Sequence, residues 1–170
     1  MNDLSWSRFG ELSMSLVEQI SRDYQPEIVV GIAKGGLMPA VVIASAFSVD
    51  LFPVKLSSRH NEEIVREIPE MFVPPTQHVA NKRVLLVDDI CITLRTLNIA
   101  RQAILDLGAA EVRTATLAVH RFSKRPDWYV IESDDLLIHP WDRNMFVSGK
   151  WIINPEYQAE LDEMGVTLRG

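Results

Sequence analysis

The sequence has 170 residues, of which 47% are hydrophobic and 24% are charged, and this suits one ordinary globular domain with a sizeable core. Its 17 basic and 23 acidic side chains give a formal net charge of −6. That charge argues against a nucleic-acid or membrane-surface binder, because both ligands require a positive field. A single cysteine, Cys91, excludes an internal disulfide and a multi-cysteine zinc site. With no leader pattern and no apolar run near the roughly 20 residues of a membrane span, we expect a cytoplasmic protein.

Hydrophobic periodicity predicts alternating helices and strands through most of the chain. Trp6, Phe9, Leu12, Leu16 and Ile20 recur at steps of three and four, which is typical of an amphipathic helix over about residues 5–22. Short apolar runs predict strands at 27–32, 51–56, 83–87, 112–119 and 128–131, and later helices are expected at 38–47 and 95–107. This alternation predicts an α/β fold with a mainly parallel central sheet flanked by helices.

Two stretches lack this regularity. Residues 57–82 are polar, charged and interrupted by prolines, with no period. Because long loops in compact domains are usually functional or mobile, we expect residues 57–81 to form a mobile loop, with a tolerated surface insertion as the alternative. The tail at 142–170 is predicted to be irregular and aromatic, serving as a cap or a subunit interface. We therefore expect one domain over 1–170 that forms a homo-oligomer.

Two loops carry unusual chemistry at predicted strand ends, where open parallel sheets bind their ligands. In Ala33-Lys34-Gly35-Gly36, paired glycines allow backbone N–H groups to approach an anion at a helix start, and the lysine adds positive charge. Such a loop suits a diphosphate, although a purely structural turn is an open alternative.

The second loop places two adjacent acids, Asp88 and Asp89, where the strand at 83–87 is expected to stop. Two like charges together are costly unless they meet hydroxyl donors or a cation, such as a ribose diol or Mg²⁺. The hydroxyls of Thr93 and Thr96, with the amides of the helix start, suit a phosphate monoester. The alternative is helix capping by Asp89 or Thr93.

The segment from Val87 to Leu97 resembles the signature of type I phosphoribosyltransferases, in which a strand leads to two acids and then to two threonines at a helix start. Residues 33–36 resemble the diphosphate loop of that family, and residues 57–81 lie where it carries a mobile catalytic hood. The order holds over about residues 5–142. Residues 126–130 and 139–142 look most like the hypoxanthine, xanthine and guanine branch.

The resemblance implies transfer of a 5-phosphoribosyl group from 5-phosphoribosyl 1-diphosphate to a nucleobase, a 6-oxopurine, with release of diphosphate in purine salvage. It assigns catalysis to Lys34, Asp88 and Asp89, and Mg²⁺ to the two acids, indirectly through ribose or water. The residues expected to bind the donor are Lys34, Gly35, Gly36, Asp88, Asp89, Thr93, Leu94, Arg95 and Thr96. The residues expected to contact the base are His120, Leu136 and Leu137.

The sequence departs from that pattern at four positions. Leu94 replaces a glycine, Ile92 an aspartate that acts in proton transfer, His120 a lysine, and Leu136 an aromatic residue. These changes leave a second hypothesis open, a non-catalytic binder or sensor of the donor or of a nucleotide. A receiver domain fits poorly because the acids lie mid-chain, and a nucleotide kinase is disfavoured because no Gly-x-x-x-x-Gly-Lys-Ser/Thr loop is present.

Overall fold

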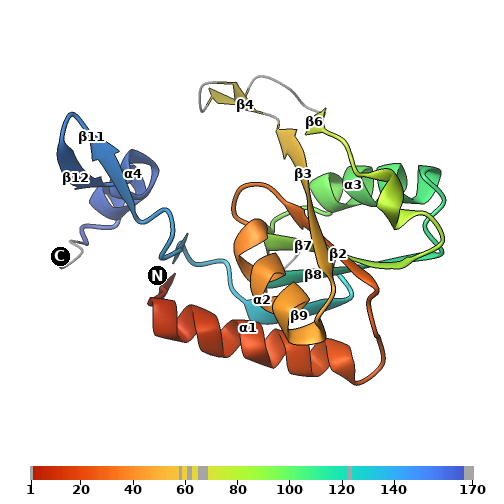
Figure 1. The fold of residues 1–170 in the computed structure, drawn as a ribbon. Coiled ribbons are helices and arrows are strands. Elements are labelled where there is room, and N and C mark those ends of the chain that lie inside the picture. Colours follow the sequence, from red (N-terminus) through yellow and green to blue (C-terminus); the bar gives the residue numbers. More distant parts are fainter. Residues whose placement is uncertain (1, 58, 61–62, 65–68, 122–123, 167–170) are drawn as a thin grey trace. The chain divides into compact units, whose positions relative to one another are not determined.

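The computed structural model describes residues 2–57, 59–60, 63–64, 69–121 and 124–166 (Figure 1). The chain divides into two compact units, Leu12–Asp134 and Met1–Glu11 with Asp135–Gly170. The first unit contains a six-stranded sheet in the order β6-β3-β2-β7-β8-β9, and only β6 is antiparallel to its neighbour. The strands are β2 (Ile28–Ile32), β3 (Asp50–Ser57), β6 (Glu70–Val73), β7 (Arg83–Cys91), β8 (Glu111–Val119) and β9 (Trp128–Glu132). The predicted α/β fold with a mainly parallel sheet is confirmed.

Helices lie on both faces of this sheet, with α2 (Leu37–Phe47) and α3 (Arg95–Asp106) on opposite sides (Figure 1). On the α3 side, alternate strand residues such as Val30 and Leu86 form one buried hydrophobic cluster with Ile104 of the helix. Burying strand residues on both faces explains why the sequence shows continuous apolar runs rather than alternation.

A close approach of α2 to β2 depends on Gly31. A Cβ atom at this position would lie 2.8 Å from Leu37 Cδ2 and 2.9 Å from the Ala40 Cβ atom.

The first helix of the chain, α1 (Trp6–Ser21), agrees closely with the predicted helix over residues 5–22. Within the described residues, no helix combines the length and apolar character that a membrane crossing requires.

The strand β7 is longer than predicted. It continues past Val87 through the two acids, and its pairing with β8 extends to Asp88↔Thr116, Ile90↔Ala118 and Cys91↔Val119. The expectation that this strand stops at residue 87 is therefore wrong. The neighbouring β8 is nine residues long, so the ladder of backbone hydrogen bonds continues despite the charged side chains.

The proline-rich stretch after β3 is more regular than the sequence indicated. Residues 70–73 form β6 on the edge of the sheet, and η1 (Gln77–Val79) places the fully buried Val79 in the core. A small antiparallel pair, β4 (Arg59–His60) with β5 (Glu63–Ile64), precedes them. The prediction of an irregular segment is wrong for these residues. Residues 58, 61–62 and 65–68 lie outside the described part, and the expected mobility of 57–81 stays a prediction.

The prediction of an irregular tail is also wrong, because the described part of residues 142–170 forms a hairpin and a helix. The elements of this unit are β1 (Asn2–Asp3), parallel to β10 (Leu137–Ile138), the antiparallel hairpin β11 (Asn144–Val147) with β12 (Lys150–Ile153), and α4 (Pro155–Glu163). The hairpin turns at Ser148 and Gly149, which both have positive φ, as a tight two-residue turn requires. The side chain of Asn154 caps α4 by accepting from Glu156 N at 3.1 Å.

Candidate functional site

The glycine loop and the acidic pair meet at one edge of the sheet. Their strands, β2 and β7, are direct neighbours, so the loop that follows β2 lies beside the carboxyl end of β7. A Cβ atom at Gly35 would overlap the Asp89 carboxylate. A Cβ atom at Gly36 would lie 2.7 Å from Asp88 Cα and from the carbonyl oxygens of Ile32 and Val87. Only glycines allow this approach of the two segments.

Backbone donors are available in the glycine loop. The carbonyls of Lys34 and Gly35 accept hydrogen bonds from Leu37 N at 3.1 Å and Met38 N at 3.0 Å, and these bonds start α2. In the described part of the chain, the N–H groups of Lys34, Gly35 and Gly36 donate to no acceptor. The Lys34 side chain is exposed, and the Ala33–Lys34 peptide bond is cis. Unpaired amides with a lysine at a helix start form a setting that favours an anion.

The acidic pair is half-buried at the same edge. Asp89 N donates to Asp88 Oδ1 at 3.0 Å, and Ile90 N donates to Asp89 Oδ1 at 2.8 Å. No lysine or arginine among the described residues forms an ion pair with either carboxylate. Burial first, and then the charge of Asp89, raise the pKa of Asp88 well above its ordinary value of 3.8. The arrangement is costly for the protein alone, and hydroxyl donors or a cation would offset that cost.

The chemistry of this pair fits Mg²⁺ only with help from a ligand. Carboxylate oxygens are donors that Mg²⁺ prefers, but it usually retains several waters or phosphate oxygens. Within the described residues, no group of three or more histidine, cysteine, aspartate or glutamate side chains could hold a metal ion. A metal at this edge would therefore need oxygens from a bound diphosphate, a ribose or water in addition to Asp88 and Asp89.

The start of α3 lacks the side-chain cap that was the alternative for this loop. Leu94 occupies the N-cap position and makes no capping hydrogen bond, so neither Asp89 nor Thr93 caps the helix. Thr93 and Arg95 are exposed, and Thr96 is half-buried in the first turn. The N-cap position therefore supplies no side-chain acceptor to this helix start, and two hydroxyls lie beside it, as binding of a phosphate monoester requires.

His120 follows β8 at the same edge of the sheet. Its N–H donates to Cys91 O at 3.2 Å, and its side chain is one-third exposed. The imidazole Nδ1 lies 3.8 Å from Asp134 Oδ1, and that carboxylate accepts a 2.9 Å hydrogen bond from Arg121 N. Sequence reasoning missed Asp134, because it stands fourteen positions from His120 and belongs to no motif. Its proximity comes from the parallel pairing of β8 with β9.

The other two residues expected at the base, Leu136 and Leu137, belong to the smaller unit. Leu137 is buried in β10, and Leu136 is half-buried with its carbonyl accepting from Asn2 N at 2.8 Å.

The single cysteine, Cys91, is buried in β7. Burial first, and then the nearby Asp88 charge, raise the pKa of its thiol to about 11. Such a thiol is a poor nucleophile at neutral pH, as the sequence indicated.

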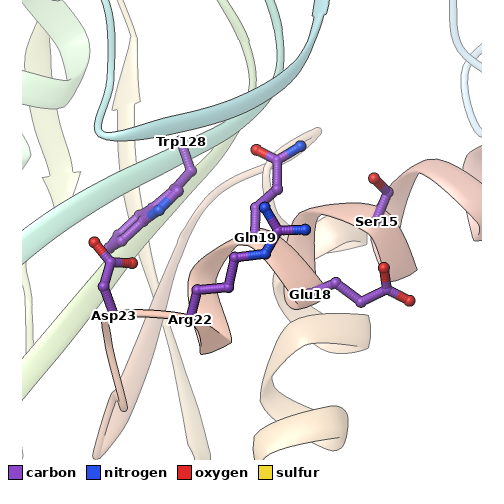
Figure 2. A pocket seen from close by; sticks show the side chains of 6 residues that line it. All are labelled: Ser15, Glu18, Gln19, Arg22, Asp23 and Trp128. Atoms are coloured by element: carbon purple, nitrogen blue, oxygen red, sulfur yellow. The ribbon is translucent and has the colours of Figure 1, made fainter.

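A separate pocket of about 480 Å³ lies away from this edge. It is lined by Ser15, Glu18, Gln19, Arg22, Asp23 and Trp128 (Figure 2). Asp23 precedes β2, and Trp128 is the first residue of β9, so the pocket lies toward the amino ends of the parallel strands. Ligands of open α/β sheets bind at the carboxyl ends, which favours the acidic pair over this pocket as the functional site.

Comparisons with known proteins agree with this geometry. The profile of the phosphoribosyl transferase domain matches residues 4–147. No curated protein sequence matches the chain. Among solved structures, the purine phosphoribosyltransferase from Pyrococcus horikoshii is 29% identical with a TM-score of 0.74, over 82% of this chain and 93% of that one.

Two further solved structures show the fold alone, since their identity is below one quarter. A hypothetical protein from Neisseria gonorrhoeae with bound ppGpp has 19% identity and a TM-score of 0.70, over 96% of this chain and 97% of that one. The xanthine-guanine-hypoxanthine phosphoribosyltransferase of Helicobacter pylori has 17% identity and a TM-score of 0.69, over 82% and 90% of the two chains.

Proposed function

The chain belongs to the phosphoribosyl transferase domain family, and we propose that its glycine loop and acidic pair hold 5-phosphoribosyl 1-diphosphate for transfer to a 6-oxopurine. The chain is a phosphoribosyltransferase, and the residues of the site and the identity of the base are the parts that we propose. The observation that carries the donor assignment is the contact of Gly35 and Gly36 with Asp88 and Asp89. This contact joins an anion-binding loop to two hydroxyl acceptors, as a diphosphate attached to a ribose requires.

Each part of the donor has a matching group. The amides of residues 34–36 and the Lys34 ammonium bind the diphosphate, which carries most of the negative charge. Asp88 and Asp89 accept hydrogen bonds from the two ribose hydroxyls. The hydroxyls of Thr93 and Thr96, with Arg95 and the amides from Leu94 onward, bind the 5′-phosphate at the start of α3.

Mg²⁺ would supply positive charge to the departing diphosphate. Asp88 and Asp89 would hold it indirectly, through ribose hydroxyls or water. The loop amides, which are fixed before the reaction begins, and the Lys34 ammonium stabilise the same developing charge.

The reaction forms a bond between a nitrogen of the base and the anomeric carbon of the ribose. The bond from that carbon to the diphosphate oxygen breaks, and the carbon passes through an oxocarbenium-like state. The two acids orient the ribose and place negative charge near that state. We propose that the segment 57–81 covers the site during transfer, since water would otherwise hydrolyse the donor.

We favour a 6-oxopurine as the acceptor of the phosphoribosyl group. Transfer to such a base would serve purine salvage. Support comes from the likeness to the purine phosphoribosyltransferase of P. horikoshii and from His120, which lies at the same edge of the sheet as the acidic pair. The matching test is a screen of hypoxanthine, guanine, xanthine, adenine and uracil with donor and Mg²⁺, monitored by diphosphate release.

The control variants for this screen are Asp88→Asn with Asp89→Asn at the site, and Asp23→Asn in the pocket of Figure 2. We expect the unaltered protein to release diphosphate with a 6-oxopurine. The Asp88→Asn, Asp89→Asn variant should lose this release, and the Asp23→Asn variant should keep it. Titration calorimetry with the donor and, separately, with ppGpp accompanies the screen. Donor binding without consumption of any base would support the non-catalytic binder instead. Absence of donor binding would refute the assignment of the site.

A further inference from the structure

A nucleobase that forms an N-glycosidic bond through a nitrogen must lose a proton, so the enzyme needs a group that can accept it. At the carboxyl edge of the sheet, the titratable side chains are few. Asp88 and Asp89 are assigned to the ribose, and the Cys91 thiol is buried with a raised pKa. Ile92, which is 57% exposed beyond the acids, has no titratable atom. Among the described residues at this edge, Lys34 is assigned to the diphosphate, and the imidazole of His120 offers a ring nitrogen that can accept a proton.

His120 lies beside the loop that carries the acids. Cys91 and Val119 are paired in the β7–β8 ladder, so residues 92 and 120 each follow one member of that pair. The hydrogen bond from His120 N to Cys91 O at 3.2 Å holds the two chain segments together at this point. The imidazole is one-third exposed, which leaves it accessible to a ligand at the edge of the sheet.

The Asp134 carboxylate lies near the Nδ1 atom of this imidazole. Its Oδ1 lies 3.8 Å from His120 Nδ1, which is longer than a hydrogen bond but close enough for attraction. An ionised carboxylate can only accept, so it favours the neutral form that carries its proton on Nδ1. The Nε2 atom then keeps its lone pair. Catalytic contacts of this kind often tighten only when a substrate is bound.

We infer that His120 Nε2 is the general base of the transfer and that Asp134 is its positioning residue, an inference that rests on the proposed function. As the base nitrogen bonds to the anomeric carbon, the bond to the diphosphate oxygen breaks and the diphosphate keeps that electron pair. The proton of the purine ring nitrogen passes to Nε2, and the imidazolium formed is stabilised by the Asp134 carboxylate. The imidazolium returns the proton to solvent after the nucleotide leaves.

The charged groups nearest His120 among the described residues are the Asp134 carboxylate and the Arg121 guanidinium, whose Nε is 3.9 Å from Asp134 Oδ2. On β7, the Cys91 carbonyl accepts from His120 N, and the Cys91 thiol belongs to the same residue. An imidazole accepts a proton only in its neutral form, so acid should lower the rate. Asp134→Asn removes the carboxylate beside Nδ1, so it should lower kcat while donor affinity stays unchanged.

The first measurement needs no turnover. Long-range ¹H–¹⁵N spectra of protein labelled in histidine, with His120 assigned by its loss in His120→Gln, report the tautomer of the ring. We expect the proton on Nδ1 in the neutral form, and a larger share of the Nε2 tautomer in Asp134→Asn but not in Asp106→Asn, a surface carboxylate on α3. A proton on Nε2 in the unaltered protein, or an unchanged tautomer ratio in Asp134→Asn, would overturn the inference.

The second measurement is kcat/KM against pH with hypoxanthine. His120→Gln should abolish the acid limb and lower kcat by about 10²- to 10⁴-fold, while calorimetry shows unchanged donor affinity. An acid limb that persists in His120→Gln, or an unchanged kcat in that variant, would overturn the inference. Neither outcome would touch the proposed function, which fails only if the unaltered protein does not bind donor or release diphosphate.

Discussion

Adding one methyl group at Gly36 tests how closely the glycine loop must approach the acidic strand. Gly36 has φ −63° and ψ −19°, so alanine can adopt its backbone conformation and only the space is at issue. The new Cβ would meet three backbone atoms at 2.7 Å, whereas ordinary contacts begin at 3.4 Å, so the segments must separate by at least 0.7 Å. Overpacking of this kind costs about 1–3 kcal/mol, which lowers Tm by about 2–12 °C for a chain of this length.

Two other glycines provide matched controls. At Gly35 the new methyl group meets only the Asp89 carboxylate, which can rotate away, so Gly35→Ala should lose donor affinity with little change in Tm. At Gly10, inside α1, no atom lies within 4 Å of the added Cβ. Gly10→Ala should therefore stabilise the helix by about 0.5–1 kcal/mol and raise Tm by about 1–4 °C.

Differential scanning calorimetry and donor titration on the three variants measure both effects. The expected order of Tm is Gly10→Ala above the unaltered protein, Gly35→Ala close to it, and Gly36→Ala below. Gly35→Ala and Gly36→Ala should both weaken donor binding, and Gly10→Ala should not. If Gly36→Ala melts like the unaltered protein and binds donor equally well, the close contact of the loop with β7 does not exist in solution.

Three more predictions concern the acidic strand. Asp88→Asn with Asp89→Asn removes two charge-assisted hydrogen bonds worth about 1.5–3 kcal/mol each, so donor affinity in calorimetry should fall by about 10²- to 10⁴-fold with an unchanged circular dichroism spectrum; full affinity would contradict the ribose assignment. The pKa of Asp88 is raised on folding, so its contribution to stability is present below the ordinary value of 3.8 and is lost as pH rises above it. Asp88→Asn alone should therefore raise the Tm of the protein without ligands at neutral pH, with a gain that shrinks in acid, and a lower Tm at neutral pH would show that the carboxylate is stabilised by contacts not seen here. Cys91 is buried with a pKa of about 11, so mass spectrometry should find it unmodified by iodoacetamide at neutral pH until the protein is denatured, and rapid alkylation of the folded protein would count against its burial.

Periodicity was sufficient to predict most elements of the larger unit. The helix over residues 5–22 and the strands at 112–119 and 128–131 lie within about one residue of α1, β8 and β9, because long apolar faces leave a clear period. The extension of β7 through Asp88 was not predictable from its own residues, since it depends on the length of the neighbouring strand. Residues 70–73 form too short a strand between prolines to show a period, and they pair only because β3 offers an edge.

The hairpin of the smaller unit did carry a local signal that the prediction overlooked. Ser148-Gly149 is a dipeptide typical of turns, and Asn154-Pro155 is a typical helix start. At the site, the meeting of two strand-end loops followed from the general rule for parallel sheets. The contact of Gly35 with Asp89 needed the strand order as well, since it exists only because β2 lies directly beside β7. The position of Asp134 required the β8–β9 pairing in the same way.

The cost of the acidic pair has a consequence for directed evolution of this protein. A library sorted for soluble expression or heat resistance rewards any change that removes the electrostatic penalty at position 88, where burial and Asp89 disfavour the charged form. Neutral residues would accumulate there, and the sorted population would gain stability while losing the proposed binding of the ribose. Sorting in the presence of saturating donor reverses this pressure, because the bound hydroxyls then favour the ionised carboxylate. The choice of ligand during screening would thus decide whether the acid at position 88 is kept or discarded.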